Sequence, residues 1–172
     1  MKALTKKYLI IQQHKFFFEV FERARRFDQR NTWHPERWLL DHLIQVSDKL
    51  KEEDLELFLA GVFHDLGKLT TARPAPRGNS YQYFGHEKIS ADWYEQEFGP
   101  EINSRVTHDV NKVVWLIQNH MKILIFKQLS ERKRRELELH LYFEDLKKLR
   151  IADEEGRDPP NGTFIVREPP DL

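Results

Sequence analysis

Hydrophobic residues recur every three to four positions over most of the chain, which is the spacing of amphipathic helices. The first stretch, over about residues 2–27, contains no Gly or Pro and predicts one long helix. A second helix is predicted over about 35–51, because Pro35 suits the first helical position. The remaining helices are predicted over about 53–66, 86–98, 102–121 and 130–155. No series of strands interrupts this pattern, so we expect an all-α bundle of about six or seven helices.

The chain is expected to form a single domain. Its 172 residues are enough to bury a hydrophobic core without disulfides or other cross-links. We place the domain at residues 1–158, with an N-terminal helix over 1–28, a helical core over 33–157 and a C-terminal tail over 159–172. The connection over 70–85 is the one long stretch without helical period in this body, and long ordered loops are often functional.

Charge and cysteine content exclude several classes of function. The chain has 28 Lys and Arg against 28 Asp and Glu, so it lacks the basic surface that extended DNA or RNA binding requires. It has no cysteine, so any metal must take histidine and carboxylate ligands. The apolar stretches are too short to span a bilayer and no signal-peptide pattern is present, so we expect a cytoplasmic protein without membrane contact.

The most informative residues are a histidine and an aspartate, His64 and Asp65, at the end of an apolar run. Gly67 follows them as a natural helix C-terminus, and such a pair offers a divalent metal two ligands at once. A second pair, His108 and Asp109, serves as a control, because it lies near the start of a polar-flanked helix without comparable partner residues. We therefore assign chemistry to the first pair.

Other metal-competent side chains fall on inward-facing or helix-end positions. His42 lies on the apolar face of the second predicted helix, and Asp153 lies on the core-facing line of the last. Taken singly, each such residue has an ordinary interpretation as a buried histidine or a capping aspartate, although a lone buried carboxylate is costly. Together they predict a site for one or two divalent ions, with the ligands His42, His64, Asp65, His86, His120 and Asp153.

Such a site suits the hydrolysis of phosphate esters. Mixed nitrogen and oxygen ligands accept Mn, Fe, Co, Ni or Zn as well as Mg, and two ions sharing a water can supply the nucleophile. Asp65, as a ligand, and Lys68, which follows the His-Asp turn and would stabilise charge on the phosphoryl group, are the expected catalytic residues. Arg157, just past Asp153, is a further candidate cation, with ordinary surface charge as the equally weighted alternative.

Several short motifs occur in a fixed order and together resemble a known family. They are His34-Pro35-Glu36, His42, His64-Asp65-Leu66-Gly67-Lys68, Gly85-His86-Glu87, His120 and Ala152-Asp153-Glu154-Glu155-Gly156-Arg157. Their order resembles the HD superfamily of metal-dependent phosphohydrolases, and within it the HD domain that follows the nucleotidyltransferase core of bacterial CCA-adding enzymes. By position, that family's ligands for one metal and then for a second would be His42, His64, Asp65 and Asp153, then His86 and His120. The resemblance implies phosphatase and 2′,3′-cyclic phosphodiesterase activity on nucleotides and RNA phosphate ends.

The chain departs from that family in two ways. Its 172 residues leave no room for a nucleotidyltransferase core, so CCA addition is not expected. The segment over 71–84 carries side chains that suit the phosphate and base of a nucleotide, namely Arg73, Arg77, Tyr81 and Tyr83. We expect His34, Arg77 and Arg157 to contact the substrate, and the neutral charge balance favours one or two nucleotides at a phosphate end.

Two alternative functions stay open at this point. The same ligand set would serve a nucleotidase, or a hydrolase of dinucleoside polyphosphates or cyclic nucleotides. Alternatively, the chain is a non-enzymatic, metal-stabilised module that binds RNA or a protein through its N-terminal helix, whose aromatic residues also favour contact with a second copy of the chain. The full ligand set together with Lys68 favours an enzyme.

Overall fold

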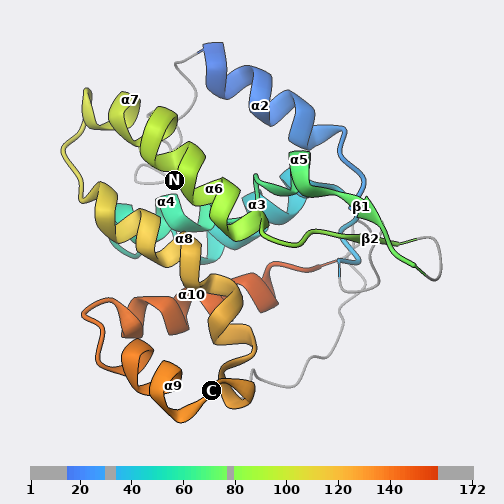
Figure 1. Cartoon of the computed structure of the whole chain (residues 1–172). Coiled ribbons are helices and arrows are strands. Elements are labelled where there is room, and N and C mark those ends of the chain that lie inside the picture. The colour runs from blue at the N-terminus through green and yellow to red at the C-terminus, as the bar shows by residue number, and fades with distance from the viewer. Residues whose placement is uncertain (1–14, 30–33, 77–79, 159–172) are drawn as a thin grey trace.

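Helices make up most of the regular structure of the chain, as Figure 1 shows. The computed structural model describes residues 15–29, 34–76 and 80–158. The α-helices in this part are α2 (Lys15–Arg25), α3 (Leu39–Lys49), α4 (Leu55–Phe63), α5 (Lys68–Thr71), α6 (His86–Trp93), α7 (Gly99–Asn103), α8 (Val110–Leu124), α9 (Glu131–Glu138) and α10 (Phe143–Glu155). Seven of them have eight residues or more, which confirms the predicted all-α bundle of six or seven helices.

Short elements connect these helices. A π-helical turn, Tyr94–Phe98, joins α6 to α7, and a 3-10 turn, Phe126–Gln128, follows α8. Two short strands, β1 (Arg73–Pro74) and β2 (Tyr81–Gln82), pair antiparallel within the connection that was predicted to be non-helical. This small hairpin brings the start of α6 back beside α5, and α5 contacts α6.

Helix α4 lies at the centre of the fold. Its residues from Leu57 to Phe63 are all buried, and a helix that is hydrophobic on every side must be surrounded by other elements. Helices α3, α8 and α10 pack against it (Figure 1). Its first turn is held by Asp54, whose side chain accepts the Leu57 N–H at 2.8 Å. Because the chain leaves α4 in the interior, the turn that follows, residues 64–67, is buried as well.

Helix α2 covers one side of the core through an aromatic side chain. The Phe17 ring lies 5.1 Å from the Phe98 ring and 6.1 Å from the Phe63 ring, measured between centroids. The neighbouring Phe18 is exposed. The predicted helix over 2–27 is therefore observed from residue 15 to residue 25, and its first part lies outside the described residues.

The second helix begins at Leu39 and not, as predicted, at Pro35. Residues 34–37 form a turn in which Arg37 has a positive φ of 67°. This turn is paired with the preceding segment, because the Gln29 N–H donates to the Arg37 carbonyl at 2.9 Å. The prediction was wrong because helical periodicity does not register such pairing between irregular segments.

Two other predicted helices are interrupted. The helix predicted over 130–155 is two helices, α9 and α10, and the His140 ring between them stacks on Trp115 of α8 with centroids 3.8 Å apart. The helix predicted over 102–121 is broken before α8, where Asp109 caps the new helix with its side chain. Neither break contains Gly or Pro, so the local sequence lacks the strongest signals for a break.

Two glycines, the buried Gly67 and the exposed Gly85, serve different purposes. Gly67 has an ordinary right-handed backbone with φ −60°, so it is not a left-handed helix cap. Instead, the backbone of α6 lies against it, and a Cβ at this position would lie 2.2 Å from the His86 carbonyl oxygen and 2.9 Å from Ser90 N. Gly85 has φ +79° and open space around it, so only its backbone conformation favours glycine.

Replacing Gly67 by Ala is expected to lower the free energy of unfolding by about 3 kcal/mol, because the new Cβ would push α6 away from the turn. Gly85→Ala should cost only about 1 kcal/mol, because it strains the backbone without a clash. Urea denaturation of the two variants measures both values. Equal losses would contradict the close packing of α6 against Gly67.

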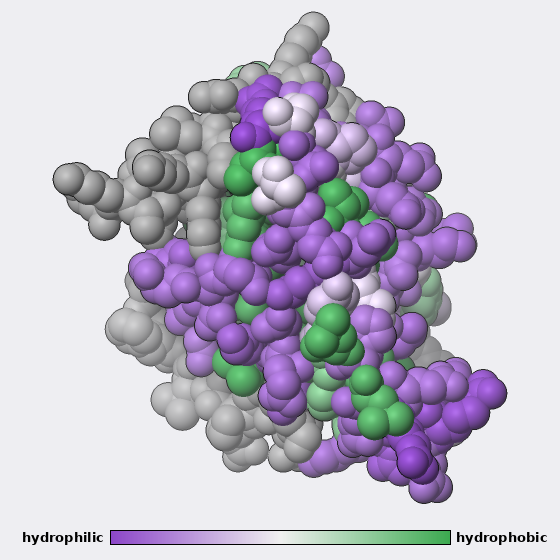
Figure 2. All heavy atoms as spheres, turned by 90° about the vertical axis from the view of Figure 1, so that its left-hand side faces the viewer, coloured by the Kyte–Doolittle hydropathy of each residue, from purple (hydrophilic) through white to green (hydrophobic). Residues whose placement is uncertain are grey.

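The surface is mainly hydrophilic on the side that Figure 2 displays, and its hydrophobic side chains lie there in small separate groups. This agrees with a chain in which 33% of residues are charged. Among the described residues, none of the helices has the length and apolar character that crossing a membrane requires.

Candidate metal centre

The turn after α4 places two polar side chains in the interior. His64 directs Nδ1 at the Gly61 carbonyl oxygen, 2.9 Å away, and so pairs one of the carbonyl groups that a helix end leaves free. Asp65 follows, and only 3% of its surface is exposed. An unpaired carboxylate in such a place would be costly, so its neighbours must offset the burial of its charge.

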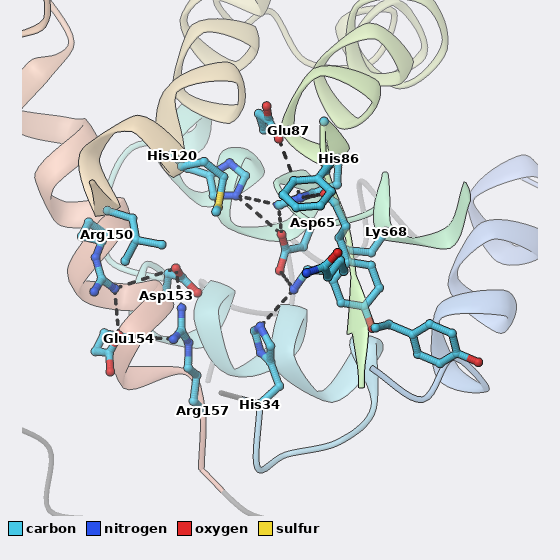
Figure 3. A pocket seen from close by; sticks show the side chains of 17 residues that line it. His34, Asp65, Lys68, His86, Glu87, His120, Arg150, Asp153, Glu154 and Arg157 are labelled. Atoms are coloured by element: carbon cyan, nitrogen blue, oxygen red, sulfur yellow. Dashed lines mark hydrogen bonds and ion pairs between the residues drawn. The ribbon is translucent and has the colours of Figure 1, made fainter. Parts of the chain in front are cut away.

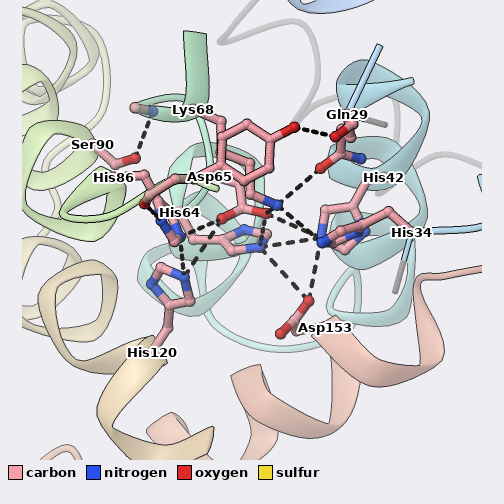
Figure 4. Close-up of polar contacts among 12 residues, drawn as sticks. Gln29, His34, His42, His64, Asp65, Lys68, His86, Ser90, His120 and Asp153 are labelled. Atoms are coloured by element: carbon pink, nitrogen blue, oxygen red, sulfur yellow. Dashed lines mark hydrogen bonds and ion pairs between the residues drawn. The ribbon is translucent and has the colours of Figure 1, made fainter. Parts of the chain in front are cut away.

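The structure brings together all six residues predicted to hold metal, as Figure 4 shows. In addition to the His64-Asp65 turn, His42 comes from α3, His86 from the first position of α6, His120 from α8 and Asp153 from α10. All six are buried. Residues distant in sequence therefore converge on one point, as predicted for the metal site.

The carboxylate of Asp65 divides this cluster into two halves. Its Oδ2 lies 3.4 Å from Nε2 of both His42 and His64. Its Oδ1 lies 3.0 Å from Nε2 of His86 and 3.5 Å from Nε2 of His120. Two groups of potential ligand atoms thus share one carboxylate, an arrangement that could hold a metal ion on either side of it.

Asp153 belongs to the first half. Its Oδ1 lies 3.2 Å from Nε2 of His42 and 4.0 Å from Nε2 of His64. Its Oδ2 accepts a hydrogen bond from the guanidinium of Arg157 at 2.9 Å. Arg157, predicted to contact substrate, is therefore neither exposed nor free, and it orients one of the candidate ligands.

The four histidine rings have the orientation that metal binding requires. Each Nδ1 lies within 3.0 Å of a backbone carbonyl oxygen, which belongs to Gly156 for His42, Gly61 for His64, Tyr83 for His86 and Ile117 for His120. Because a carbonyl can only accept, each Nδ1 carries a proton and each Nε2 faces the cluster. The Nε2 atoms lie 3.3 Å apart in His42 and His64 and 3.2 Å apart in His86 and His120. Two lone pairs at such distances repel unless a proton or a cation lies between them, so the donor set fits a metal.

Both buried carboxylates are ionised. Burial alone would raise the pKa of Asp65, but Lys68 and the neighbouring histidines hold it well below its usual range. Burial likewise opposes ionisation of Asp153, and Arg157 together with His42 lowers its pKa well below the usual range. The centre therefore offers negative oxygen ligands at physiological pH.

The histidines of the first half differ in their protonation. Burial lowers the pKa of His64 to about 3, so this ring is neutral at physiological pH. Burial acts in the same direction on His42, but its hydrogen bonds with Asp153 and Glu36 outweigh it and raise the pKa of His42 to about 9. A cation bound in this half would take the place of the second His42 proton.

Lys68, predicted to be catalytic, is buried beside Asp65. Its Nζ lies 2.6 Å from Oδ2 of Asp65 and donates to Oε1 of Gln29 at 2.8 Å and to Nε2 of His34 at 3.1 Å. The Tyr83 ring covers it, with the centroid 5.3 Å from Nζ. All three ammonium hydrogens thus have acceptors, so a substrate oxygen would have to replace one of them.

Two buried residues of this region were missed by the sequence reasoning. Gln29 and Glu36 are both completely buried. Oε1 of Glu36 lies 2.7 Å from Nδ1 of His34, 3.0 Å from Nδ1 of His42 and 3.2 Å from Nε2 of Gln29. Neither residue lies in a helix, so helical spacing could not place them inside, and the only available signal was that Glu36 belongs to the motif with His34.

Four members of the cluster, Asp65, His86, His120 and Asp153, line the floor of a pocket of about 710 Å³, and His42 and His64 lie beneath them. Figure 3 shows Lys68 and Arg157 on opposite sides of this floor, with His34 near Lys68. The predicted substrate contacts His34 and Arg157 both line the pocket, whereas Arg77 lies outside the described residues. A pocket of this size is typical of small-molecule sites.

The tyrosines predicted to stack on a base have different positions. Tyr83 is buried but also lines the pocket, and its hydroxyl donates to the Gln29 carbonyl oxygen, which holds its ring over Lys68. Tyr81 is half-buried and lines the pocket. Arg73 is exposed on β1 and is not among the residues that line the pocket.

The control pair, His108 and Asp109, has a structural role. Nε2 of His108 lies 2.7 Å from the Tyr94 hydroxyl. Asp109 accepts the Lys112 N–H at 3.1 Å as the cap of α8 and the Tyr142 hydroxyl at 2.7 Å. This pair has local partners, but it takes no part in the groups that could hold a metal among the described residues.

Comparison with known proteins adds no identification. The chain matches no protein-family model, and a search of curated proteins finds no match. The assignment of the centre therefore rests on its own geometry.

Calorimetric titration of the protein with Mn²⁺ or Co²⁺ is expected to show two ions per chain. His120→Ala should lose one ion and Asp65→Ala both, because the Asp65 carboxylate is shared between the halves. His108→Ala is the control. It should keep both ions but be less stable, because it loses the contact of His108 with Tyr94. Absence of binding in the unmodified protein, or loss of an ion in His108→Ala, would contradict the assignment.

Proposed function

We propose that the protein is a metal-dependent phosphohydrolase of the HD type, acting on small nucleotides or RNA phosphate ends in the manner of a 2′,3′-cyclic phosphodiesterase or phosphatase. The observation that carries the proposal is the Asp65 carboxylate, shared between two pairs of histidine Nε2 atoms at the floor of a pocket. The order of motifs that resembles the HD superfamily supports the same conclusion.

Divalent ions held in this centre would activate a water molecule and withdraw charge from the phosphoryl oxygens. The protein's own groups add to this. Lys68 offers a buried positive charge beside Asp65, and its hydrogen bond to His34, the longest of its three at 3.1 Å, is the one that a phosphoryl oxygen can replace. Arg157 keeps Asp153 ionised and turned toward His42.

The rim of the pocket favours a small substrate with an aromatic base. Phe84 lies two positions before His86, lines the pocket and is 78% exposed, which is unusual for a phenylalanine. Tyr81 and Leu124 line the same pocket. We infer that the base stacks on this rim while the phosphate meets the floor.

Hydrolysis of a 2′,3′-cyclic mononucleotide and of p-nitrophenyl phosphate esters is expected in the presence of Mn²⁺, Co²⁺, Ni²⁺ or Mg²⁺. Lys68→Met, which keeps the apolar stem, should lower kcat about 100-fold while both ions stay bound, because charge stabilisation is removed. Asp109→Ala should leave kcat unchanged. A comparison of cyclic and linear nucleotides, including dinucleoside polyphosphates and cyclic second messengers, identifies the preferred substrate.

The outcome also decides among the alternatives. Activity confined to long RNA with a steep salt dependence would contradict recognition of a phosphate end. Binding of metal without hydrolysis of any of these esters would favour a non-enzymatic RNA- or protein-binding module.

Phe84→Ala is expected to raise KM for the 2′,3′-cyclic mononucleotide about 10-fold, because base–aromatic stacking contributes about 1–3 kcal/mol. The same variant should leave kcat/KM for methyl phosphate nearly unchanged, since this ester has no aromatic ring to stack. Steady-state kinetics on both substrates test this difference. A similar loss on all substrates would show that Phe84 supports the pocket itself and does not recognise the base.

A further inference from the structure

Glu36 is a buried carboxylate that the proposed chemistry does not use. It has no exposed surface, and its Oε2 is buried without a hydrogen bond in the described structure. The next residue, Arg37, has the strained φ of 67°. A buried charge with an unsatisfied oxygen and a strained neighbour both lower stability, and such features are retained mainly at functional sites.

The first contact of Glu36 is with His42. The other three rings of the centre are held by the carbonyl three residues earlier in the chain, so their orientation is local. His42 has no such local partner, and its Nδ1 is held by Glu36 Oε1 and by the Gly156 carbonyl, each at 3.0 Å. A carboxylate behind a ligating imidazole fixes the ring and increases its basicity.

The second contact leads to Lys68. Oε1 of Glu36 accepts a hydrogen bond from the Nδ1–H of His34, so His34 must present Nε2 as an acceptor to Lys68. Glu36 also accepts from the side-chain NH₂ of Gln29, so Gln29 must turn its oxygen toward Lys68. One carboxylate thereby orients two of the three acceptors that hold the ammonium group.

We propose that Glu36 is a positioning residue that couples the first metal position, through His42, to the pocket cation Lys68. The inference rests on the proposed function, because it treats the cluster as a metal centre. Glu36 touches neither a reacting atom nor the candidate ligand atoms that face the cluster, and it acts through the residues that it orients.

The test uses Glu36→Gln, which keeps the size of the side chain and removes its charge. Co²⁺ is titrated into the variant in two backgrounds: His120→Ala, which leaves the first position, and His42→Ala, which leaves the second. Co²⁺ affinity at the first position should fall about 10- to 100-fold, with a changed visible absorption spectrum of the bound ion. Affinity at the second position should change less than about threefold, since His86 and His120 do not contact Glu36.

Asp41→Asn is the matched control. Asp41 lies one residue before His42 on α3 and is exposed, so its replacement removes the same charge without touching a ring. Its Co²⁺ affinities should match those of the unmodified protein at both positions. At saturating Co²⁺, kcat of Glu36→Gln on p-nitrophenyl phosphate should stay about 10-fold low, because the acceptors of Lys68 are no longer oriented, and Asp41→Asn should retain full kcat.

Each outcome has one meaning. Equal affinities in Glu36→Gln and the unmodified protein would overturn the role of Glu36 and leave the metal centre intact. Equal weakening of both positions would show a general structural role and overturn it too. Failure of the unmodified protein to bind Co²⁺ would overturn the metal centre and the inference together. If Glu36→Gln does not fold, Glu36→Asp, which keeps the charge but shortens the reach, is measured in the same way.

Discussion

The arrangement of the centre depends on one buried charge, the carboxylate of Asp65. Taking an ionised carboxylate out of water costs several kcal/mol, so it persists only where other groups offset that cost. Here Lys68 lies 2.6 Å from Oδ2, and histidine Nε2 atoms lie around both oxygens. Helices α3, α6 and α8 and the turn after α4 contribute these histidines, so the packing of the bundle determines the electrostatics of its centre.

The apolar character of α4 explains why this charge is in the interior at all. A helix buried on every side ends inside the molecule, and its last carbonyl groups need donors there. His64 meets that need with Nδ1, which leaves Nε2 facing Asp65. The same use of a nearby carbonyl recurs in His86 and His120. The orientation of these three rings is therefore set by their neighbours in the sequence, whereas that of His42 is not, and helix packing brings the four rings together.

This division explains what the sequence could predict. Periodicity and helix-end position placed His42, His64 and Asp153 inside, and the structure brings them together, because helix faces are a local property. The predicted positions of helix ends were less accurate. Pro35, the predicted start of the second helix, lies in a turn, and the break at His140 depends on stacking with Trp115 from another helix. Gln29 and Glu36 were missed because their burial depends on pairing between two irregular segments. Such pairing leaves no periodic pattern in the sequence. Function, substrate and domain limits were predicted from the motifs and stay predictions.

In the proposed function, the charges of the centre link metal occupancy to substrate binding. Three buried carboxylates, Asp65, Asp153 and Glu36, face the buried Lys68 and the partly buried Arg157, so without bound ions the group has an excess of negative charge. The second proton of His42 offsets that excess. Divalent ions in place of the proton would make the floor of the pocket strongly positive, and only then would a phosphate dianion be attracted to it. Because linkage is reciprocal, a phosphate ester that binds there must in turn tighten the hold on the ions.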